Sequence, residues 1–182
     1  MGILLAFSPF IIFAILERIV GPVAGLAAGT VVSALLLLRD IFSPQRKPKI
    51  LEIGTLVLFG GLTAYMALGG AVLSVIGVRL CVDTGLLLIV LISMVVRSPF
   101  TLQYAREQVA PELWNTPEFV HTNYVITAAW ALAFALMVLA EIVLLYVPQI
   151  PHRAGVIVIV LALVGALKFT SWYPSKGRRP LN

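Results

Sequence analysis

Five ionisable residues are predicted within apolar runs of this chain or at the ends of such runs: Glu141, Arg79, Asp83, Glu17 and Arg18. A charge at the centre of a bilayer costs roughly 2.5–3.5 kcal/mol on insertion scales, so each of these residues needs a physical reason. Glu141 lies about two helical turns before the proline that ends its run. Arg79 and Asp83 are four residues apart, so on a helix they share one face and can pair.

Two interpretations of these five residues remain open. In the first, they form an intramembrane polar site that opens to the outer side and binds protons or a solute. In the second, they are ion pairs at helix ends, with the arginine side chains reaching the lipid headgroups. We favour the second interpretation because four of the five residues are predicted near the ends of helices.

Residues for other chemistry are sparse. The single cysteine, Cys81, cannot form an intramolecular disulfide, and it excludes a metal site built from several cysteines. The two histidines, His121 and His152, are predicted on opposite sides of a membrane. No zinc-protease, phosphate-loop or nucleophile-elbow motif occurs in the sequence. We therefore predict no catalytic residues, no cofactor, no metal and no enzymatic activity.

The composition predicts an integral membrane protein. Hydrophobic residues make up 60% of the 182 residues and charged residues 12%, with a mean hydropathy of +1.04. The charges fall mainly in short breaks between apolar runs, whereas a soluble domain needs a charged surface on every side. The net charge of +5 does not indicate nucleic acid as a partner, because the basic residues flank apolar runs. We expect one membrane domain over residues 1–182.

Six apolar runs predict an all-α bundle of about six membrane spans, at roughly Ile3–Ile19, Pro22–Leu38, Ile50–Leu68, Val82–Val96, Tyr124–Val147 and Ala154–Trp172. A spanning helix needs about 20 apolar residues, which the third, fifth and sixth runs provide. The first two runs are either two short spans or a hairpin that does not cross fully. The fourth is short unless it begins near Val78, which would place Arg79 and Asp83 inside its first turns.

The distribution of Lys and Arg predicts the orientation. If six spans alternate, ten basic residues lie on the inner side (Arg39, Arg46, Lys47, Lys49, Arg97, Arg106, Lys168, Lys176, Arg178, Arg179) and three on the outer side (Arg18, Arg79, Arg153). Cytoplasmic loops are enriched in basic residues, so both termini are expected in the cytoplasm, including the basic tail at 173–182.

Residues 97–123 form the longest polar segment between apolar runs. Its prolines divide it into a short helix and a second, partly apolar piece around Trp114. We predict an interfacial element on the cytoplasmic membrane surface that offers a docking site for partners; a simple connecting loop is the alternative. Trp172 and Tyr173 end the last apolar run and are predicted anchors at headgroup depth.

Small residues predict close helix packing. Gly21, Gly25 and Gly29 recur every four residues, and Gly60 and Gly61 lie in the middle of the third run. Such faces let another helix backbone approach closely. They serve either oligomerisation or packing within the chain, and we favour packing of the second run against the first or third.

Several segments follow one another in a familiar order: Phe7, Pro9, Phe10 and Phe13 in the first run, residues 57–63 (VLFGGLT), Arg97 to Phe100, and then Trp114, Asn123, Trp130, Ala131 and Phe134. In this order the chain resembles the intracellular septation protein A (YciB) family of bacterial inner-membrane proteins. It departs from that family in a longer linker at 103–123 and in its own basic tail.

The resemblance implies a multi-pass protein of the bacterial cell inner membrane, linked to septation, cell division and cell envelope synthesis. It supplies no catalytic residues. The expected partners are the lipid bilayer and other inner-membrane envelope or division proteins, with a homo-oligomer as a further option. The alternative function is a small transporter or channel with a polar site near Glu141 and Asp83. An integral membrane enzyme acting on lipid has the least support.

Overall fold

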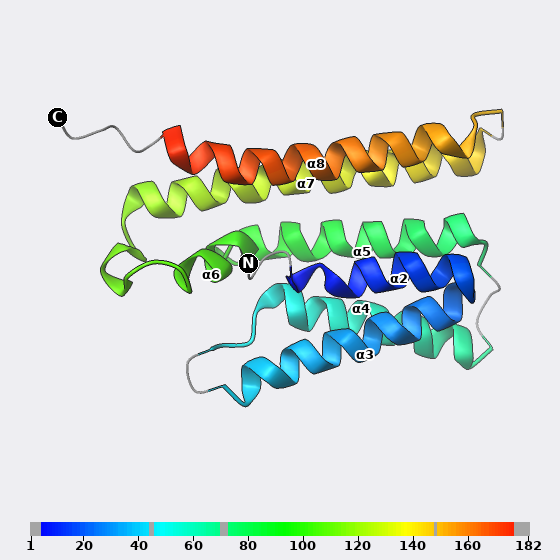
Figure 1. The fold of residues 1–182 in the computed structure, drawn as a ribbon, viewed down its shortest axis with the longest axis horizontal. Helices are drawn as coiled ribbons and strands as arrows, with labels where there is room; N and C mark the ends of the chain where they lie inside the picture. The colour runs from blue at the N-terminus through cyan, green and yellow to red at the C-terminus, as the bar shows by residue number, and fades with distance from the viewer. Residues whose placement is uncertain (1–4, 44–45, 70–72, 148, 177–182) are drawn as a thin grey trace. The chain divides into compact units, whose positions relative to one another are not determined.

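The computed structural model describes residues 5–43, 46–69, 73–147 and 149–176, and within these ranges the regular structure is entirely helical (Figure 1). The helices are α2 (Ser8–Ile19), α3 (Pro22–Ile41), α4 (Ile50–Ala67), α5 (Val75–Val95), α6 (Phe100–Arg106), the 3-10 turn η1 (Pro111–Leu113), α7 (Pro117–Tyr146) and α8 (His152–Lys176). The predicted all-α class is confirmed. Residues 177–182 of the predicted basic tail lie outside the described ranges.

Five helices in the described ranges are long and apolar enough to cross a membrane: α3, α4, α5, α7 and α8. The first predicted run differs. Its helix α2 has 12 residues, which corresponds to a length of about 18 Å against a hydrocarbon core of about 30 Å. The full count of six spans therefore stays a prediction.

Three helix boundaries differ from the predicted runs. Helix α5 begins at Val75, which places Arg79 and Asp83 within its first turns. Helix α7 begins at Pro117 and not near residue 124, because a proline at the first helical position has a backbone preset for helix and lacks a donor that would be unsatisfied there. Helix α8 continues through Pro174 to Lys176, beyond the predicted end at residue 172.

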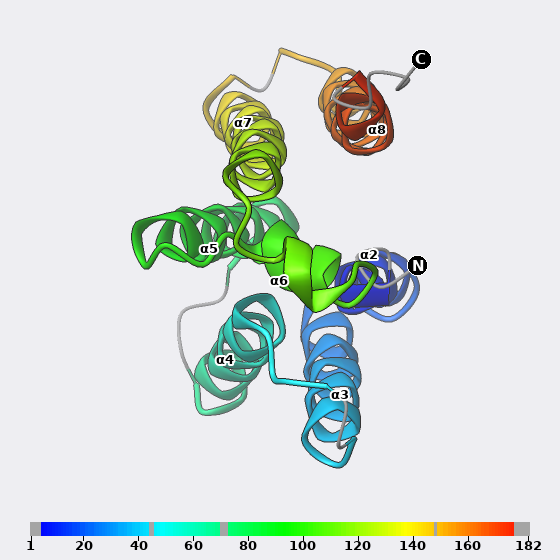
Figure 2. The same ribbon diagram turned by 90° about the vertical axis from the view of Figure 1, so that its left-hand side faces the viewer.

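The chain divides into two compact units, residues 1–89 and 90–182, with α5 running from the first into the second. In the first unit α3 packs against both α2 and α4 (Figure 2). The core of this unit consists of Phe13, Leu26, Phe59, Val78 and Val82, all nearly inaccessible to solvent. The Phe13 and Phe59 rings lie 5.6 Å apart, so α2 and α4 share this core.

In the second unit α8 packs along α7 (Figure 1). Helix α6 also packs against α7. Trp130 of α7 is buried, and its indole N–H donates to the Thr170 hydroxyl of α8 over 2.9 Å. The Thr101 hydroxyl of α6 lies 2.7 Å from that of Thr127 and donates to the Asn123 carbonyl. The short helix predicted between the fourth and fifth runs is thus present. Its location on a membrane surface stays a prediction.

The end of α5 is built as a left-handed cap. Arg97 has φ +56°, its N–H donates to the Met94 carbonyl, and the Ser98 N–H donates to the Ser93 carbonyl. This pair of bonds satisfies the last carbonyls of the helix, and Pro99 then prevents the helix from continuing. The Ser93 hydroxyl also accepts a bond from the Phe100 N–H, which fixes the start of α6.

Candidate functional site

The beginning of α3 lies beside an ion pair between α2 and α5, which we call the Glu17–Arg79 bridge. The Arg79 Nε lies 3.0 Å from both carboxylate oxygens of Glu17 and donates to them. The Glu17 side chain is 1% exposed and that of Arg79 is 25% exposed. Since the two residues are 62 positions apart in sequence, this bridge holds a long-range contact inside the first unit.

The remaining predicted site residues have different surroundings. Asp83 lies one turn after Arg79 on α5 and is buried, whereas Arg18 is exposed at the end of α2. Glu141 is buried on α7, in the second unit. Four of the five predicted residues therefore belong to one unit and Glu141 to the other. Their convergence on a single polar site stays a prediction.

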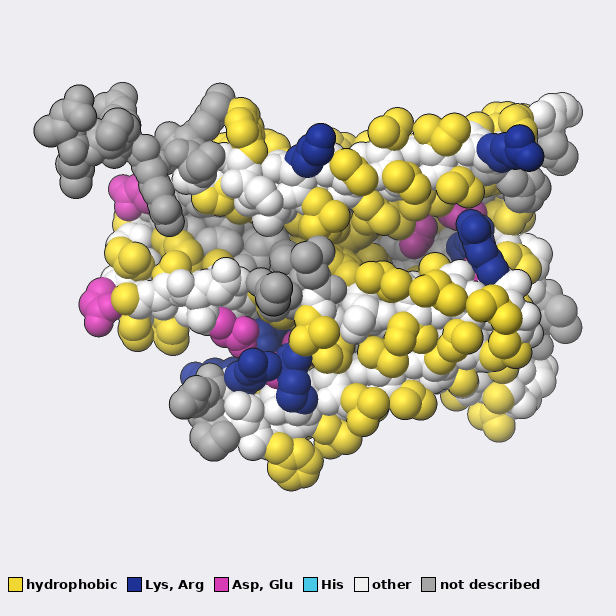
Figure 3. Space-filling model, viewed as in Figure 1, with side chains coloured by type: hydrophobic (Ala, Val, Ile, Leu, Met, Phe, Trp, Pro, Cys, Tyr) yellow, Lys and Arg dark blue, Asp and Glu magenta, His cyan; other side chains and the backbone are white. Residues whose placement is uncertain are grey.

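The opposite end of α3 carries a second charged group that the sequence interpretation did not select as a site. We call it the Asp40 network; it consists of Arg39, Asp40, Arg46, Lys49 and Glu52. The Asp40 side chain is fully buried, and those of Glu52 and Lys49 are 2% and 4% exposed. Figure 3 shows positive and negative side chains gathered over the end of α3 and the beginning of α4.

Asp40 is the centre of this network. Its carboxylate accepts a hydrogen bond from the Arg39 Nε at 2.9 Å and another from the Lys49 ammonium. The Arg46 guanidinium lies 3.7 Å away. Glu52 is reached by Lys49 at 3.6 Å and by Arg39 at 3.7 Å. Two buried carboxylates therefore lie among three cations, of which Arg39 and Lys49 contact both acids and Arg46 contacts only Asp40.

The local sequence explains this arrangement. Helix α3 ends at Ile41 and α4 begins at Ile50, so the connection between them is short and returns the chain beside α3. Lys49 is the N-cap residue of α4 in extended conformation, and Glu52 lies in the first turn of α4. The feature of the sequence that could have pointed to this network is an aspartate next to an arginine at the end of an apolar run. An acid in the first turn of a helix is already favoured by the helix dipole, so the position of Glu52 in the sequence gives no sign that it shares cations with Asp40.

The Glu17–Arg79 bridge and the Asp40 network both hold helices together through paired charges. Buried charges are costly unless they are paired and hydrogen-bonded, and removing one partner leaves the other charge uncompensated. Among the described residues, no three His, Cys, Asp or Glu side chains are grouped so that they could hold a metal ion.

The predicted packing glycines fall into three classes. A Cβ atom on Gly25 would lie 3.0 Å from the Phe13 carbonyl oxygen and 3.0 Å from the Glu17 nitrogen, both in the α2 backbone. A Cβ atom on Gly29 would lie 2.8 Å from the Phe59 ring of α4. Thus Gly25 and Gly29 pack inside the chain. Gly21 instead precedes α3 with φ +117°, a turn conformation that residues with a side chain rarely adopt.

The two other predicted glycines, in the middle of α4, have more room. A Cβ atom on Gly60 would meet only a methyl group of Thr30 at 3.6 Å, and one on Gly61 would meet nothing within 4 Å. The close approach of α4 to α5 instead uses Gly54 and Gly85, which the sequence interpretation did not select. Isolated glycines without a four-residue repeat gave no signal for these contacts.

The three predicted interfacial aromatics have defined neighbours. The Trp114 indole N–H donates to the Val109 carbonyl, and Arg106 lies 5.9 Å from the centre of the Trp114 ring. Tyr173 stacks on Phe169 with 5.1 Å between the ring centres, and Trp172 is half exposed beside the same phenylalanine. Their depth in a membrane stays a prediction.

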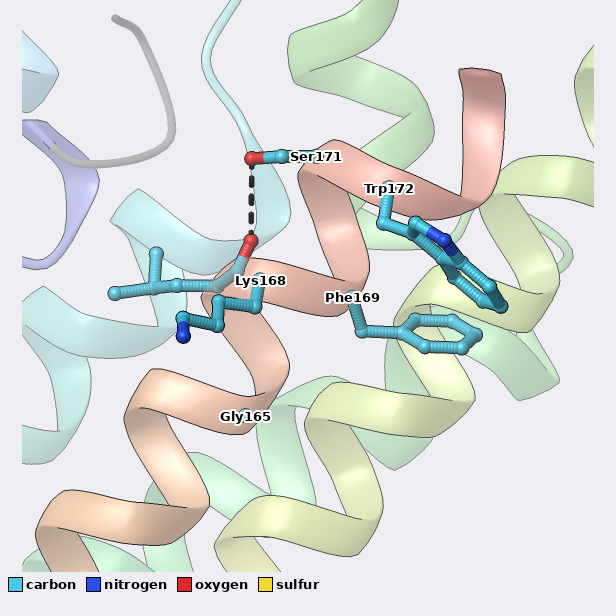
Figure 4. A pocket seen from close by; sticks show the side chains of 6 residues that line it. Gly165, Lys168, Phe169, Ser171 and Trp172 are labelled. Carbon is cyan, nitrogen blue, oxygen red and sulfur yellow. Dashed lines mark hydrogen bonds between the residues drawn. The ribbon is translucent and has the colours of Figure 1, made fainter. Parts of the chain in front are cut away.

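A shallow hollow of about 710 Å³ lies on the surface of α8 (Figure 4). Its lining residues all belong to α8: Gly165, Leu167, Lys168, Phe169, Ser171 and Trp172. The Ser171 hydroxyl donates to the Leu167 carbonyl of its own helix. A hollow formed by a single helix does not enclose a ligand, so it adds no binding site to the two charged groups.

Comparisons of the chain with protein-family models, with curated proteins and with solved structures each found no match.

Proposed function

We propose that this protein is a non-enzymatic, multi-pass protein of the bacterial inner membrane that supports septation and envelope assembly through contacts with other membrane proteins. The septation assignment rests on the ordered resemblance of the sequence to the intracellular septation protein A family. The contact-based mechanism rests on one structural observation, which is the use of buried charge between helices.

That observation is the pairing of Glu17 with Arg79 and of Asp40 with Arg39 and Lys49. Charges used in this way stiffen a helical scaffold and leave its outer faces for lipid and protein contacts. Those faces are apolar: Val31 and Leu35 of α3 are 58% and 60% exposed, and Val57 of α4 is 69% exposed. A helical unit held together by buried charge, with apolar outer faces, suits a protein that acts by binding its neighbours in the membrane.

The proposed topology places both termini and the α3–α4 connection in the cytoplasm. It is tested with a Cys81→Ala background that carries one new cysteine at Lys47 or at Arg153. A membrane-impermeant thiol reagent applied to intact cells should label position 153 and spare position 47. The reverse labelling would overturn the orientation.

The function is tested by deletion and by cross-linking in the native host. Deletion should give filamentous or misshapen cells, or cells sensitive to envelope stress. A photo-crosslinking amino acid at exposed Leu132 should capture an envelope or division protein, whereas the same group at fully buried Phe134 should not. Normal division and envelope integrity, together with no capture of such a protein, would contradict the proposal.

A small transporter or channel is the second candidate. The observation that favours it is the burial of three carboxylates in or beside apolar helices, those of Glu17, Asp83 and Glu141. Proton flux into proteoliposomes that is lost in Glu141→Gln and kept in Glu118→Gln, an exposed control on the same helix, would favour this candidate. Equal flux in all three proteins and in empty vesicles would eliminate it.

A further inference from the structure

The α3–α4 connection carries more positive charge than its own carboxylates compensate. Between residues 39 and 52 there are four cations, Arg39, Arg46, Lys47 and Lys49, and only two carboxylates, Asp40 and Glu52. Lys49 is buried against both carboxylates, and Arg39 contacts both as well. These two cations balance the two acids, so the charge of Arg46 and Lys47 is in excess.

The excess cations are also the accessible ones. The Arg46 side chain is 43% exposed, and Lys47 is exposed. The 3.7 Å between Arg46 and Asp40 is longer than a hydrogen bond, so this contact is an ion pair that does not fix the guanidinium. A guanidinium has five N–H donors in a geometry that matches phosphate oxygens. Arg46 is therefore placed to bind an anion from the outside of the network.

Apolar side chains lie next to these cations. Leu38, Ile41 and Phe42, at the end of α3, are 46%, 55% and 80% exposed. Because α3 and α4 are both long and apolar enough to span a membrane, their connection falls at the level of the lipid headgroups. A free anion in water would use the cations alone, whereas a phospholipid uses the cations for its phosphate and the apolar side chains for its acyl chains.

We propose that the α3–α4 connection binds the headgroup of an anionic phospholipid, with Arg46 and Lys47 on the phosphate and with Phe42 and Ile41 beside the acyl chains. The lipid phosphate would neutralise the excess charge of Arg46 and Lys47, whereas Asp40 and Glu52 neutralise Arg39 and Lys49. This inference does not depend on the septation proposal; it requires only that α3 and α4 span a membrane.

The test measures the preference of the full-length protein for phosphatidylglycerol over phosphatidylcholine. The protein is reconstituted into vesicles of phosphatidylcholine, and spin-labelled forms of the two lipids report which lipid is held at its surface. A basic residue near a membrane surface contributes about 1 kcal/mol, which corresponds to roughly a fivefold change in association. Arg46→Gln with Lys47→Gln should therefore lower the preference roughly 25-fold.

The matched control removes two exposed cations elsewhere, by Arg18→Gln with Arg153→Gln. It should keep most of the preference. An equal loss in both double variants would mean general attraction of a basic protein to anionic lipid, and would overturn the site. The thermal unfolding midpoint of each variant in detergent should stay close to that of the parent, since all four positions are exposed and only the weak contact of Arg46 with Asp40 is lost. This measurement separates lost binding from lost fold.

A second arm distinguishes the lipid from a free anion. Inorganic phosphate at moderate concentration should not displace the labelled phosphatidylglycerol beyond its effect as a salt, and Phe42→Ala should weaken retention of that lipid. Specific displacement by phosphate, with no effect of Phe42→Ala, would show an anion site and overturn the lipid proposal.

Discussion

The two ends of α3 are joined to their neighbours in different ways. At its beginning, Gly25 packs on the α2 backbone, and one ion pair, Glu17 with Arg79, links α2 to α5. At its end, the five residues of the Asp40 network gather within a stretch of 14 residues of chain. The loop closed by the network is short, and the loop closed by the bridge is long.

This difference separates two roles of buried charge. The entropic cost of closing a loop grows with its length, so a local network forms more readily than a contact between distant residues. The Asp40 network therefore fixes the α3–α4 hairpin. The Glu17–Arg79 bridge instead links α2 to a helix that is distant in sequence. The following predictions test this division.

The largest effect is expected from Asp40→Asn, because the carboxylate is fully buried and compensates at least two cations. Breaking a buried ion pair by removing one partner typically costs about 3–5 kcal/mol. The free energy of unfolding, measured by denaturant titration in detergent micelles, should fall by about this amount. The control is Asp40→Leu combined with Lys49→Met, which removes both charges and should recover most of the loss. A double variant less stable than Asp40→Asn would contradict the idea that the loss comes from leaving the charge of Lys49 unpaired.

A smaller loss is expected from Glu17→Gln. Hydrogen bonds to charged groups contribute about 1.5–3 kcal/mol, and the Arg79 left behind is one quarter exposed, so it can turn toward water or headgroups. We expect a loss of about 2 kcal/mol in the same titration. Glu118→Gln, which changes an exposed carboxylate, should leave stability unchanged. If Glu17→Gln cost as much as Asp40→Asn, the bridge would be as tightly enclosed as the network.

The sequence predicted the presence of the five long apolar helices because hydropathy over about 20 residues is a local property, although α5 and α7 each begin seven residues before the predicted run. It also located Glu17, Arg79 and Asp83. It did not predict that Glu17 pairs with Arg79, since spacing along one helix suggested Asp83 as the partner and a contact between α2 and α5 leaves no local pattern. Asp40 was missed for a related reason: an acid among basic residues between two apolar runs reads as ordinary loop charge until the helices fold beside each other.

The glycine contact at the beginning of α3 gives the third prediction. In Gly25→Ala the new methyl group would lie 3.0 Å from two backbone atoms of α2, which cannot rotate away as a side chain can. Overpacking of this kind costs about 1–3 kcal/mol, and the gain in helix propensity offsets up to about 1 kcal/mol. We expect a net loss of about 1–2 kcal/mol in the titration. Gly61→Ala, with open space around the new atom, should instead be neutral or stabilising.

The smallest effect on stability is expected from Arg46→Gln. Arg46 belongs to the Asp40 network but lies 3.7 Å from the carboxylate and is 43% exposed, so its pair resembles a surface salt bridge worth less than about 1 kcal/mol. Added salt should remove even this difference from the parent, whereas the effect of Asp40→Asn should persist, because exposed charges are screened far more than buried ones. A large, salt-independent loss in Arg46→Gln would place Arg46 among the buried members of the Asp40 network and remove it from lipid binding. A small, salt-sensitive loss keeps the two roles apart: Arg39 and Lys49 hold the hairpin, and Arg46 remains accessible for an anion.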